Sequence, residues 1–300
     1  MNGNTKKLSR LAFLGTQVAL IAGIFLRGAS GCEVELSSSA GQSSQVVSPS
    51  SGKVTQLFNG QDLSGFDHWL QGVGEEDPNR AFSVVDGMIR ISGEGIGYLA
   101  TVDNFRDYHL SLEYRWGMNT DGSGSVRNSG ILLHATGAHG NYKGRWMASI
   151  ECQLAQGCEG DLIVMQGQDL AGNTIPVFIA SDTTLASDGR TRWNRGGTKT
   201  DYSGRQFWWS RHQVDFEERL DNRGENDVAN PVGEWTRVEC LCIGDRITIK
   251  INGVTVNECY EVSPSSGKIL LENEGSEVFF RNLELYSVSV PIKKTNTDNR

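Results

Sequence analysis

The sequence predicts an all-β protein with two sheets packed as a β-sandwich or jelly roll. Many short runs alternate apolar with polar residues, which is the period of a strand with one buried face. Turn signals separate these runs at near-regular spacing, and no amphipathic helical pattern is convincing. The 36 Gly and only 6 Pro indicate many turns, and the length suits one large domain.

The N-terminal segment predicts export. Basic residues at positions 6–10 precede an apolar run over 11–26 that is too short and interrupted for a confident membrane-spanning helix. This order is typical of a secretory signal. The segment ends at Ala29-Ser30-Gly31-Cys32, where small residues precede a cysteine as in a bacterial lipobox, although Ala29 replaces the usual Leu. Residues 1–32 are therefore predicted to be a secretory or lipoprotein signal, with lipidation at Cys32.

The regions that flank the domain are polar. Residues 33–53 are rich in Ser and offer little to bury, so we expect a flexible tether there. The folded domain is expected over 54–292, with a long insertion at about 168–232, and a polar tail over 293–300. We expect an exported protein, periplasmic or at the cell surface, whose membrane contact is made only through the N-terminal lipid.

Charge and cysteine content narrow the function. The net charge of −8, without a basic cluster in the domain, argues against nucleic acid as a partner. Five cysteines follow Cys32, so at least one is unpaired or pairs outside the domain. Cys240 and Cys242 lie on one face of a predicted strand with a spacing unlike a zinc site. We interpret the five as buried apolar side chains, among which an oxidising compartment would allow one disulfide.

The first elements of the domain are predicted from local patterns. Residues 54–66 combine a short apolar segment with residues that favour turns. Residues 82–91 form a hairpin of two alternating runs around Asp86-Gly87, a dipeptide suited to positive φ. A short strand over 97–102 and a longer one over 108–116 follow.

The central stretch, 128–154, holds two predicted strands and organises the chain. In the second strand, one face carries Met147, Ser149, Glu151 and Gln153, and the other carries Ala148, Ile150, Cys152 and Leu154. A polar row on a strand whose back lies in the core can present chemistry to a ligand in a groove. The alternative is an ordinary strand with a solvated outer face.

The remaining elements follow in order. After a short strand over 160–167, we expect the insertion to contain a strand over 207–215 and otherwise loop, forming a lid or groove wall. The C-terminal part is regular again. Its predicted strands are 235–243, 246–251 and 254–260 joined by Asn252-Gly253, 268–272 and 278–288.

Seven motifs then identify a resemblance. In order they are LFNGQDLSGF, FSVVDGMIRISG, the segment from YLAT to DYHLSLEYRW, RNSGILLH, SIECQL, GEWTRVECLCIGDRITIKINGVTVN and ILLENEGSEVFFRNLEL. Together they resemble the 3-keto-disaccharide hydrolase family over about 54–288, apart from the insertion. The resemblance implies a concanavalin A-like, laminarinase-like two-sheet jelly roll.

The resemblance also implies a reaction. The substrate would be a glucoside already oxidised at C3 by a separate sugar 3-oxidoreductase. A C3 ketone acidifies the C2 proton, so a base removes it, the C1 oxygen leaves by β-elimination and water adds to the enone. Such chemistry needs a base, an acid and donors for the enolate oxygen. The polar row has one carboxylate, Glu151, which disfavours a double-displacement glucanase, since that mechanism needs two carboxyls about 5–5.5 Å apart.

Three residues are the predicted catalytic groups. Glu151 would be the general base or a ligand for a sugar hydroxyl or cation, and its alternative is a solvated or salt-bridged strand residue. His134, at the end of the preceding strand, would be the acid or enolate stabiliser, although a lone His is more often structural. The resemblance places Glu274 in the same groove.

Substrate-binding candidates are expected around the same groove. They are Arg127, Asn128, Gln153, Trp146, Trp208 and Arg281. The tryptophans could stack on a sugar ring or belong to the core. Arg281 could instead pair with Glu274 as a structural clamp, and Arg127 and Asn128 could serve turn chemistry.

The sequence assigns no cofactor. It has no His-x-His or EF-hand-like pattern, yet a Ca²⁺ site of carboxylates and carbonyls would not show in the spacing. Beside the enzyme, two hypotheses remain open at this level: a non-catalytic carbohydrate-binding module of the same fold, and a structural adhesion domain.

Overall fold

The computed structural model describes residues 45–50 and 53–288. The predicted signal with Cys32, most of the predicted tether and the polar tail lie outside these residues. The described part contains 19 strands and no helix, so it has no helix long and apolar enough to cross a membrane. The prediction of an all-β fold is confirmed.

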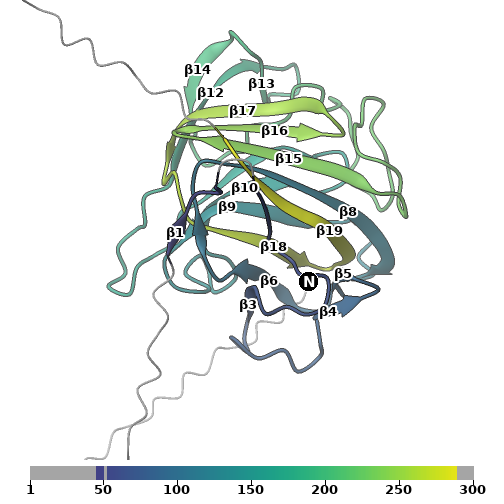
Figure 1. Ribbon diagram of the computed structural model, residues 1–300. Helices are drawn as coiled ribbons and strands as arrows, with labels where there is room; N and C mark the ends of the chain where they lie inside the picture. The colour runs from purple at the N-terminus through teal and green to yellow at the C-terminus, as the bar shows by residue number, and fades with distance from the viewer. Residues whose placement is uncertain (1–44, 51–52, 289–300) are drawn as a thin grey trace, which may run out of the picture. The chain divides into compact units, whose positions relative to one another are not determined.

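Two antiparallel sheets form most of the domain, and a separate pair of short strands is described below (Figure 1). The small sheet runs in the order β11 (Leu162–Met165), β10 (Ala148–Gln153), β9 (Gly130–Thr136), β18 (Lys268–Glu274), β6 (Ile96–Thr101) and β3 (Phe66–Leu70). The large sheet runs in the order β13 (Thr191–Trp193), β12 (Phe178–Leu185), β17 (Val254–Ser263), β16 (Arg246–Ile251), β15 (Thr236–Ile243), β8 (Tyr108–Thr120), β19 (Ser276–Ser287), β5 (Met88–Ile91) and β4 (Phe82–Val85), with β14 (Thr198–Asp201) on β12 and β2 (Val54–Gln56) on β19. This is the two-sheet jelly roll of the concanavalin A-like class.

The main core lies where the two sheets pack face to face. Period-two alternation decides which side chains enter it, so β15 buries Val238, Cys240 and Cys242 while Arg237 stays exposed. Both sheets contribute to one continuous hydrophobic cluster. The described cysteines are all buried and free: Cys152, Cys158, Cys240, Cys242 and Cys259. Buried apolar cysteines are therefore confirmed, and a disulfide among these five is absent.

The other face of the small sheet is covered as well. A second hydrophobic cluster on that face includes Leu132 and Leu270 together with Tyr98. The loop at 137–147 contributes to the cover, since its His139 ring stacks on Tyr98 with 5.8 Å between centroids. The small sheet is consequently buried on both sides, and the alternative of a solvated outer face on β10 is wrong.

Two hairpin predictions are confirmed in detail. Asp86 and Gly87 have φ of 50° and 73°, and Asn252 and Gly253 have φ of 47° and 79°. Asn and Asp tolerate the left-handed region better than most residues, and Gly enters it freely. Each dipeptide joins the pair of strands that the sequence predicted.

The insertion at 168–232 contains more strand than expected. β12, β13 and β14 extend the large sheet beyond β17, at the top in Figure 1. The prediction of a strand over 207–215 is wrong, because the backbone groups of these residues do not form a continuous ladder with a neighbouring strand. Phe207 and Trp208 form only isolated bridges, and the Trp209 N–H donates to Asp161 Oδ1 at 2.6 Å.

The folded part also begins before the predicted boundary at Val54. β1 (Val46–Val47) pairs in parallel with β7 (Asn104–Phe105), and Val47 packs against the main core. The C-terminal end of the predicted tether is therefore part of the domain.

Candidate functional site

Three glutamates on two strands form the most unusual cluster in the domain. Glu151 lies on β10, and Glu272 and Glu274 lie on β18, with β9 between these strands. Gln153 pairs with Gly130, and Leu271 pairs with Ile131, which places Glu272 beside Gly130 on the β18 side. All three glutamates face away from the main core, on the covered outer face of the small sheet.

Gly130 lets the two glutamates approach each other. A Cβ at this position would lie 2.5 Å from Glu272 Oε2 and 2.7 Å from Glu151 Oε1. Any other residue would therefore occupy the space in which the two carboxyl groups converge. The strand needs glycine here for its missing side chain, since the φ of Gly130 is not in the left-handed region.

Burial of this pair raises its pKa values. Glu151 is 3% exposed and Glu272 is 1% exposed. Burial, with the charge of Glu274 adding to it, raises the pKa of Glu151 to about 8. Burial and the neighbouring glutamates raise the pKa of Glu272 well above its usual value. Two like charges this close in a buried site cannot both ionise easily, so the pair retains at least one proton at neutral pH.

The hydrogen bonding of Glu272 supports a retained proton. Within the described residues, neither oxygen of Glu272 receives an N–H or hydroxyl donor. The group that converges with it over Gly130 is the Glu151 carboxyl. A buried carboxyl group that receives no donor is more stable when it is protonated, in agreement with the raised pKa of Glu272.

Glu274 is held beside the pair by Asn128. The Asn128 Nδ2 group donates to Glu274 Oε2 at 2.7 Å. Burial raises the pKa of Glu274, while the charge of Arg145 and the bond from Asn128 oppose that rise. Glu151, Glu274 and Asn128, which the sequence named, are thus brought together with Glu272, which it missed. The alternation of LLENE on β18 could have identified Glu272, since it shares the face of Glu274.

His134 lies elsewhere, which corrects its predicted role in the groove. Its φ of 54° coincides with a register shift between β9 and β10, and this bulge interrupts the alternation of side chains. The ring therefore packs edge-on against Tyr108 of the large sheet, 5.8 Å between centroids, and Nδ1 lies 3.0 Å from the Pro264 carbonyl oxygen. Burial lowers the pKa of His134 to about 4, so it is a neutral core residue.

Two predicted substrate-binding residues are occupied by other partners. The Arg127 guanidinium is buried and donates to Asp221, with Nε 2.7 Å from Oδ1. It fixes the insertion to the start of the central stretch. The Gln153 side-chain carbonyl accepts the N–H groups of Leu154 and Ala155 at 2.9 and 3.0 Å, so it caps the end of its own strand. These contacts correct the prediction that both residues face sugar hydroxyls.

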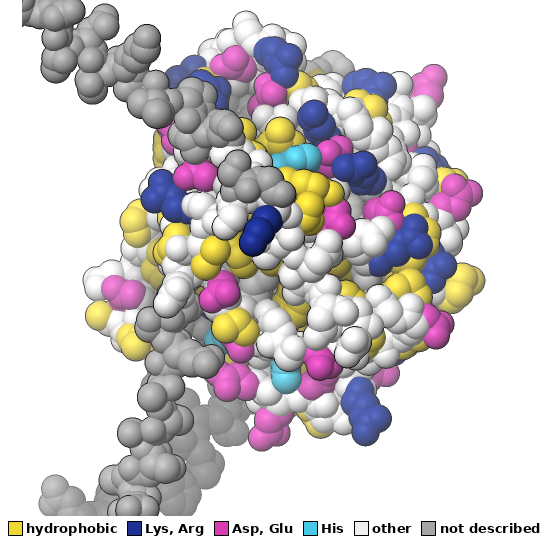
Figure 2. Space-filling view, viewed as in Figure 1, with side chains coloured by type: hydrophobic (Ala, Val, Ile, Leu, Met, Phe, Trp, Pro, Cys, Tyr) yellow, Lys and Arg dark blue, Asp and Glu magenta, His cyan; other side chains and the backbone are white. Residues whose placement is uncertain are grey.

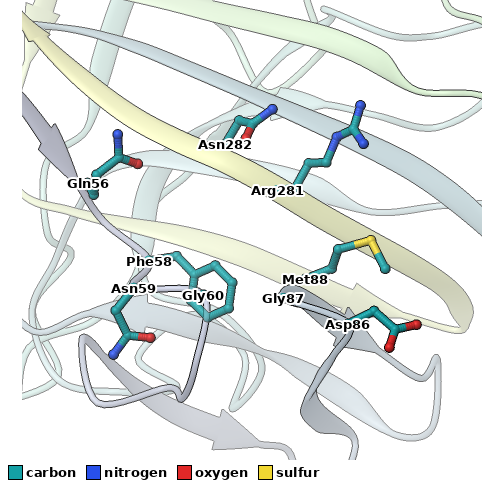
Figure 3. A pocket seen from close by; sticks show the side chains of 9 residues that line it. All are labelled: Gln56, Phe58, Asn59, Gly60, Asp86, Gly87, Met88, Arg281 and Asn282. Atoms are coloured by element: carbon teal, nitrogen blue, oxygen red, sulfur yellow. The ribbon is translucent and has the colours of Figure 1, made fainter.

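Arg281 belongs to the other sheet, which corrects its assignment to the groove. It alternates with buried Phe280 on β19 and so points outward from the large sheet. Its Nε donates to Glu113 at 2.6 Å, and its guanidinium lies 3.9 Å from the Trp235 ring centroid. Together with Asn282 it lines a separate cavity of about 480 Å³ near the Asp86 turn. Figure 3 shows the two side chains next to each other on β19. It forms no clamp with Glu274.

The two candidate tryptophans differ in position. Trp146 is buried in the second hydrophobic cluster against Tyr98, with 6.4 Å between ring centroids, so it supports the loop at 137–147 and is not a stacking surface. Trp208 lines a cavity in the insertion, where the Arg190 guanidinium lies 4.3 Å from its ring centroid.

That cavity adjoins the glutamates. Two adjoining hollows of about 440 and 530 Å³ share Ile163, Tyr202 and Gly204 in their walls, and we call them together the insertion cavity. Ile163 of β11 is the register partner of Glu151, so both side chains lie on the same face of neighbouring strands. Glu151 itself lines neither hollow, but its charge contributes to the raised pKa of Tyr202, which lines both.

The structure does not indicate a metal centre. Within residues 45–50 and 53–288, no group of three or more His, Cys, Asp or Glu side chains is arranged to hold a metal ion. We therefore derive no step through a metal.

The protein is a two-sheet jelly roll with a buried carboxyl pair on its small sheet, and the family that it matches makes it a carbohydrate-active protein. A family model described as the 3-keto-alpha-glucoside-1,2-lyase-like domain matches residues 53–286. The chain belongs to this family, which confirms the family resemblance.

Comparisons with individual proteins are more distant. Among proteins of curated function, no sequence matches. A candidate glycosyl hydrolase from Parabacteroides distasonis is 20% identical, with a TM-score of 0.47 over 79% of this chain and 94% of that one. A carbohydrate-binding module, CBM66, from Bacillus subtilis is 8% identical, with a TM-score of 0.43 over 74% and 96%. A β-glucanase from Bacillus licheniformis is 10% identical, with a TM-score of 0.39 over 80% and 99%.

Proposed function

We propose that this protein cleaves 3-keto-glucosides, including 3-keto-disaccharides, by β-elimination followed by addition of water. Membership of the 3-keto-alpha-glucoside-1,2-lyase-like family supports this substrate class. The observation that carries the mechanism is the carboxyl pair of Glu151 and Glu272, which meets over Gly130 and retains a proton. Proton abstraction next to a ketone needs a base of raised pKa, and departure of the C1 oxygen needs an acid.

In the proposed reaction, the ionised Glu151 removes the C2 proton. The C–H electron pair moves toward the C3 ketone and forms an enolate. When the ketone re-forms, a C1–C2 double bond appears and the bond from C1 to the leaving oxygen breaks, with Glu272 donating its proton to that oxygen. Water then adds its oxygen to C1 and returns a proton to C2, which yields 3-keto-glucose. Asn128 holds Glu274, whose charge raises the pKa of Glu151 and so strengthens it as a base.

The pair also fits this chemistry better than a double displacement. A nucleophilic carboxylate must be ionised in the resting enzyme, whereas burial holds the Glu151–Glu272 pair protonated. A base with a pKa of about 8 is mostly neutral at pH 7 but abstracts a proton strongly once ionised. We expect kcat/KM to increase with pH up to about pH 8, because the ionised fraction of Glu151 increases over that range.

The test is incubation with a 3-keto-disaccharide and with the unoxidised sugar, in D₂O. Release of 3-keto-glucose from the first alone, with deuterium at C2, would support elimination and hydration. We expect Glu151→Gln and Glu272→Gln to lower kcat by about 100-fold or more. The matched control is Glu284→Gln, a strand glutamate on the large sheet bonded to Gln56. Retained sugar binding without turnover by the wild-type protein would refute the proposal and favour a binding module.

The cellular setting forms part of the same proposal. The N-terminal sequence supports export, with lipidation at Cys32 holding the enzyme at a membrane surface on the periplasmic side or outside the cell. A separate sugar 3-oxidoreductase would supply the substrate, since the C3 ketone must exist before the C2 proton becomes acidic. Labelling with a radioactive fatty acid in wild type and in Cys32→Ser tests the anchor.

A further inference from the structure

The insertion cavity has a strongly basic wall beside Glu151. Arg190 and Arg205 both line it, and Lys143 lies 4.8 Å from the ring centroid of Tyr142. Tyr142 itself lines the cavity. The whole chain carries a net charge of −8, and Figure 2 shows Lys and Arg interspersed with Asp and Glu on the face in view. The overall composition of the chain, which is acidic, therefore does not explain why cations line this hollow.

The single carboxylate among the described lining residues is already neutralised. Arg192 lies behind the wall and binds Asp188 through both of its terminal nitrogens, at 2.7 Å each. This bidentate contact lowers the pKa of Asp188 far below its usual value, so Asp188 stays ionised and paired. Asp188 also lies 3.8 Å from Arg190, so its charge offsets that of Arg190 in part and leaves Arg205 without a counter-charge.

Neighbouring side chains hold Arg190 in position, although no carboxylate forms a close ion pair with it. Its guanidinium stacks on Trp208, and its Nη1 donates to His212 Nε2 at 2.7 Å. Burial lowers the pKa of His212 to about 4, so this acceptor is a neutral imidazole. The nearest carboxylate oxygen, on Asp188, lies 3.8 Å away. A held guanidinium with a neutral partner is suited to an anionic ligand.

Arg205 is the exposed member of the wall. It lines the cavity and has no hydrogen bond, ion pair or ring contact with another residue in the described part of the chain. Its neighbour Gln206, also in the wall, donates to Asp161 Oδ2 at 2.7 Å. Burial raises the pKa of Asp161 to about 8, so this second acid is mostly neutral and does not offset the cations.

We propose that the insertion cavity is the leaving-group subsite and takes a leaving group with a carboxylate, such as a uronic acid. This inference rests on the proposed function of Glu151, whose register partner Ile163 forms the shared wall of the cavity. A leaving group released by protonation of its oxygen at the carboxyl pair extends from that point into the cavity. There Arg205 and Arg190 bind the carboxylate, and Tyr202 and Trp208 flank the ring.

The first experiment compares two substrates on the full chain. They are 3-keto-glucosides of the same linkage, one to glucose and one to glucuronic acid. We expect kcat/KM for the glucuronic acid compound to be at least tenfold higher, because charge-assisted bonds to guanidinium form only with the carboxylate. We expect Arg205→Gln to remove most of this ratio through KM, and Arg205→Lys to restore part of it. The matched control, Arg195→Gln, changes an exposed arginine of the same insertion that pairs with Glu258.

A second measurement does not depend on turnover. Binding of free glucuronate and free glucose is followed by saturation-transfer NMR, in wild type and in Arg205→Gln. We expect glucuronate binding that weakens at least fivefold in Arg205→Gln and weakens with added salt. If no 3-keto-glucoside is cleaved but this binding is seen, the proposed reaction fails and the anionic subsite stands. Equal kcat/KM for the two substrates, or glucuronate binding that is unaffected by Arg205→Gln, overturns the inference.

Discussion

Replacing Gly130 with alanine tests the carboxyl pair without removing either carboxyl group. The added Cβ would lie 2.5 Å from Glu272 Oε2 and 2.7 Å from Glu151 Oε1, whereas ordinary contact begins at 3.4 Å. The two oxygens must therefore move away by about 0.7 to 0.9 Å. Both are buried, so they have little room.

The expected cost to stability is small and the expected cost to activity is large. Overpacking a buried site destabilises by about 1–3 kcal/mol, while replacing a strand glycine with alanine returns about 0.5–1 kcal/mol. The variant should therefore fold. Displacing a reacting group by about 1 Å can lower the rate by about 100-fold, so we expect kcat to decrease by that order. The apparent pKa of about 8 should increase, because the interaction with Glu272 lowers the pKa of Glu151 and separating the two carboxyl groups weakens it.

The assay is steady-state cleavage of a 3-keto-disaccharide over pH 5 to 9, with urea unfolding of the same samples. The control is Leu133→Val on the same strand, whose side chain enters the main core and whose cost is about 1 kcal/mol. It should lose stability to a similar degree and keep its activity. If Gly130→Ala folds and retains both wild-type kcat and the wild-type pH profile, then the contact between Glu151 and Glu272 has no part in catalysis.

Three further predictions concern pH and stability. Glu151 binds a proton in the folded state up to about pH 8 but only to about 4.5 when unfolded, so wild-type stability should decrease as pH increases between these values, by on the order of a few kcal/mol. Glu151→Gln should make this slope less steep without abolishing it, because the raised pKa values of Asp161 and Glu272 act in the same direction, as measured by urea unfolding at several pH values. The pKa shift of His134 has the opposite effect on the pH dependence of stability. Its pKa is about 4 when folded and 6.5 when unfolded, so acidification through this window should destabilise the wild type by about 3 kcal/mol, and a His134→Leu variant that keeps the same acid-induced loss would contradict the core assignment. Asp221→Asn should lower the urea midpoint by the equivalent of about 1–3 kcal/mol because it weakens the partner of buried Arg127, with kcat changed less than threefold; a large loss of kcat at unchanged stability would return Arg127 to the substrate site.

The sequence predicts the strands of the domain well because each has a local signature. Alternation marks β8 and β15, and Asp86-Gly87 and Asn252-Gly253 mark their turns. Part of the insertion has a strand-like sequence without a strand. Residues 207–215 have strand-like composition, yet their backbone groups bond to β11 and to the Asp161 side chain. Such partners are distant in sequence, so no local pattern shows them.

The site was predictable only in part, and for the same reason. Alternation predicts that Glu151 faces away from the main core. The family resemblance identifies Glu274 as a further candidate. The meeting of Glu151 with Glu272 depends on sheet order and on the absence of a side chain at Gly130, which act across three strands. His134 was misplaced because one bulge with positive φ moved a single side chain to the opposite face.

The free cysteines of the core have a consequence for biogenesis. While the chain is unfolded, its five domain thiols are open to oxidation, and non-native disulfides among them would block the packing of the two sheets. Once folded, the same thiols are shielded from reagents. In an oxidising compartment, correct folding therefore requires that the two sheets assemble faster than the thiols are oxidised. Pulsed alkylation would record the order in which Cys158 and the other four thiols become protected, which is the order in which the domain closes.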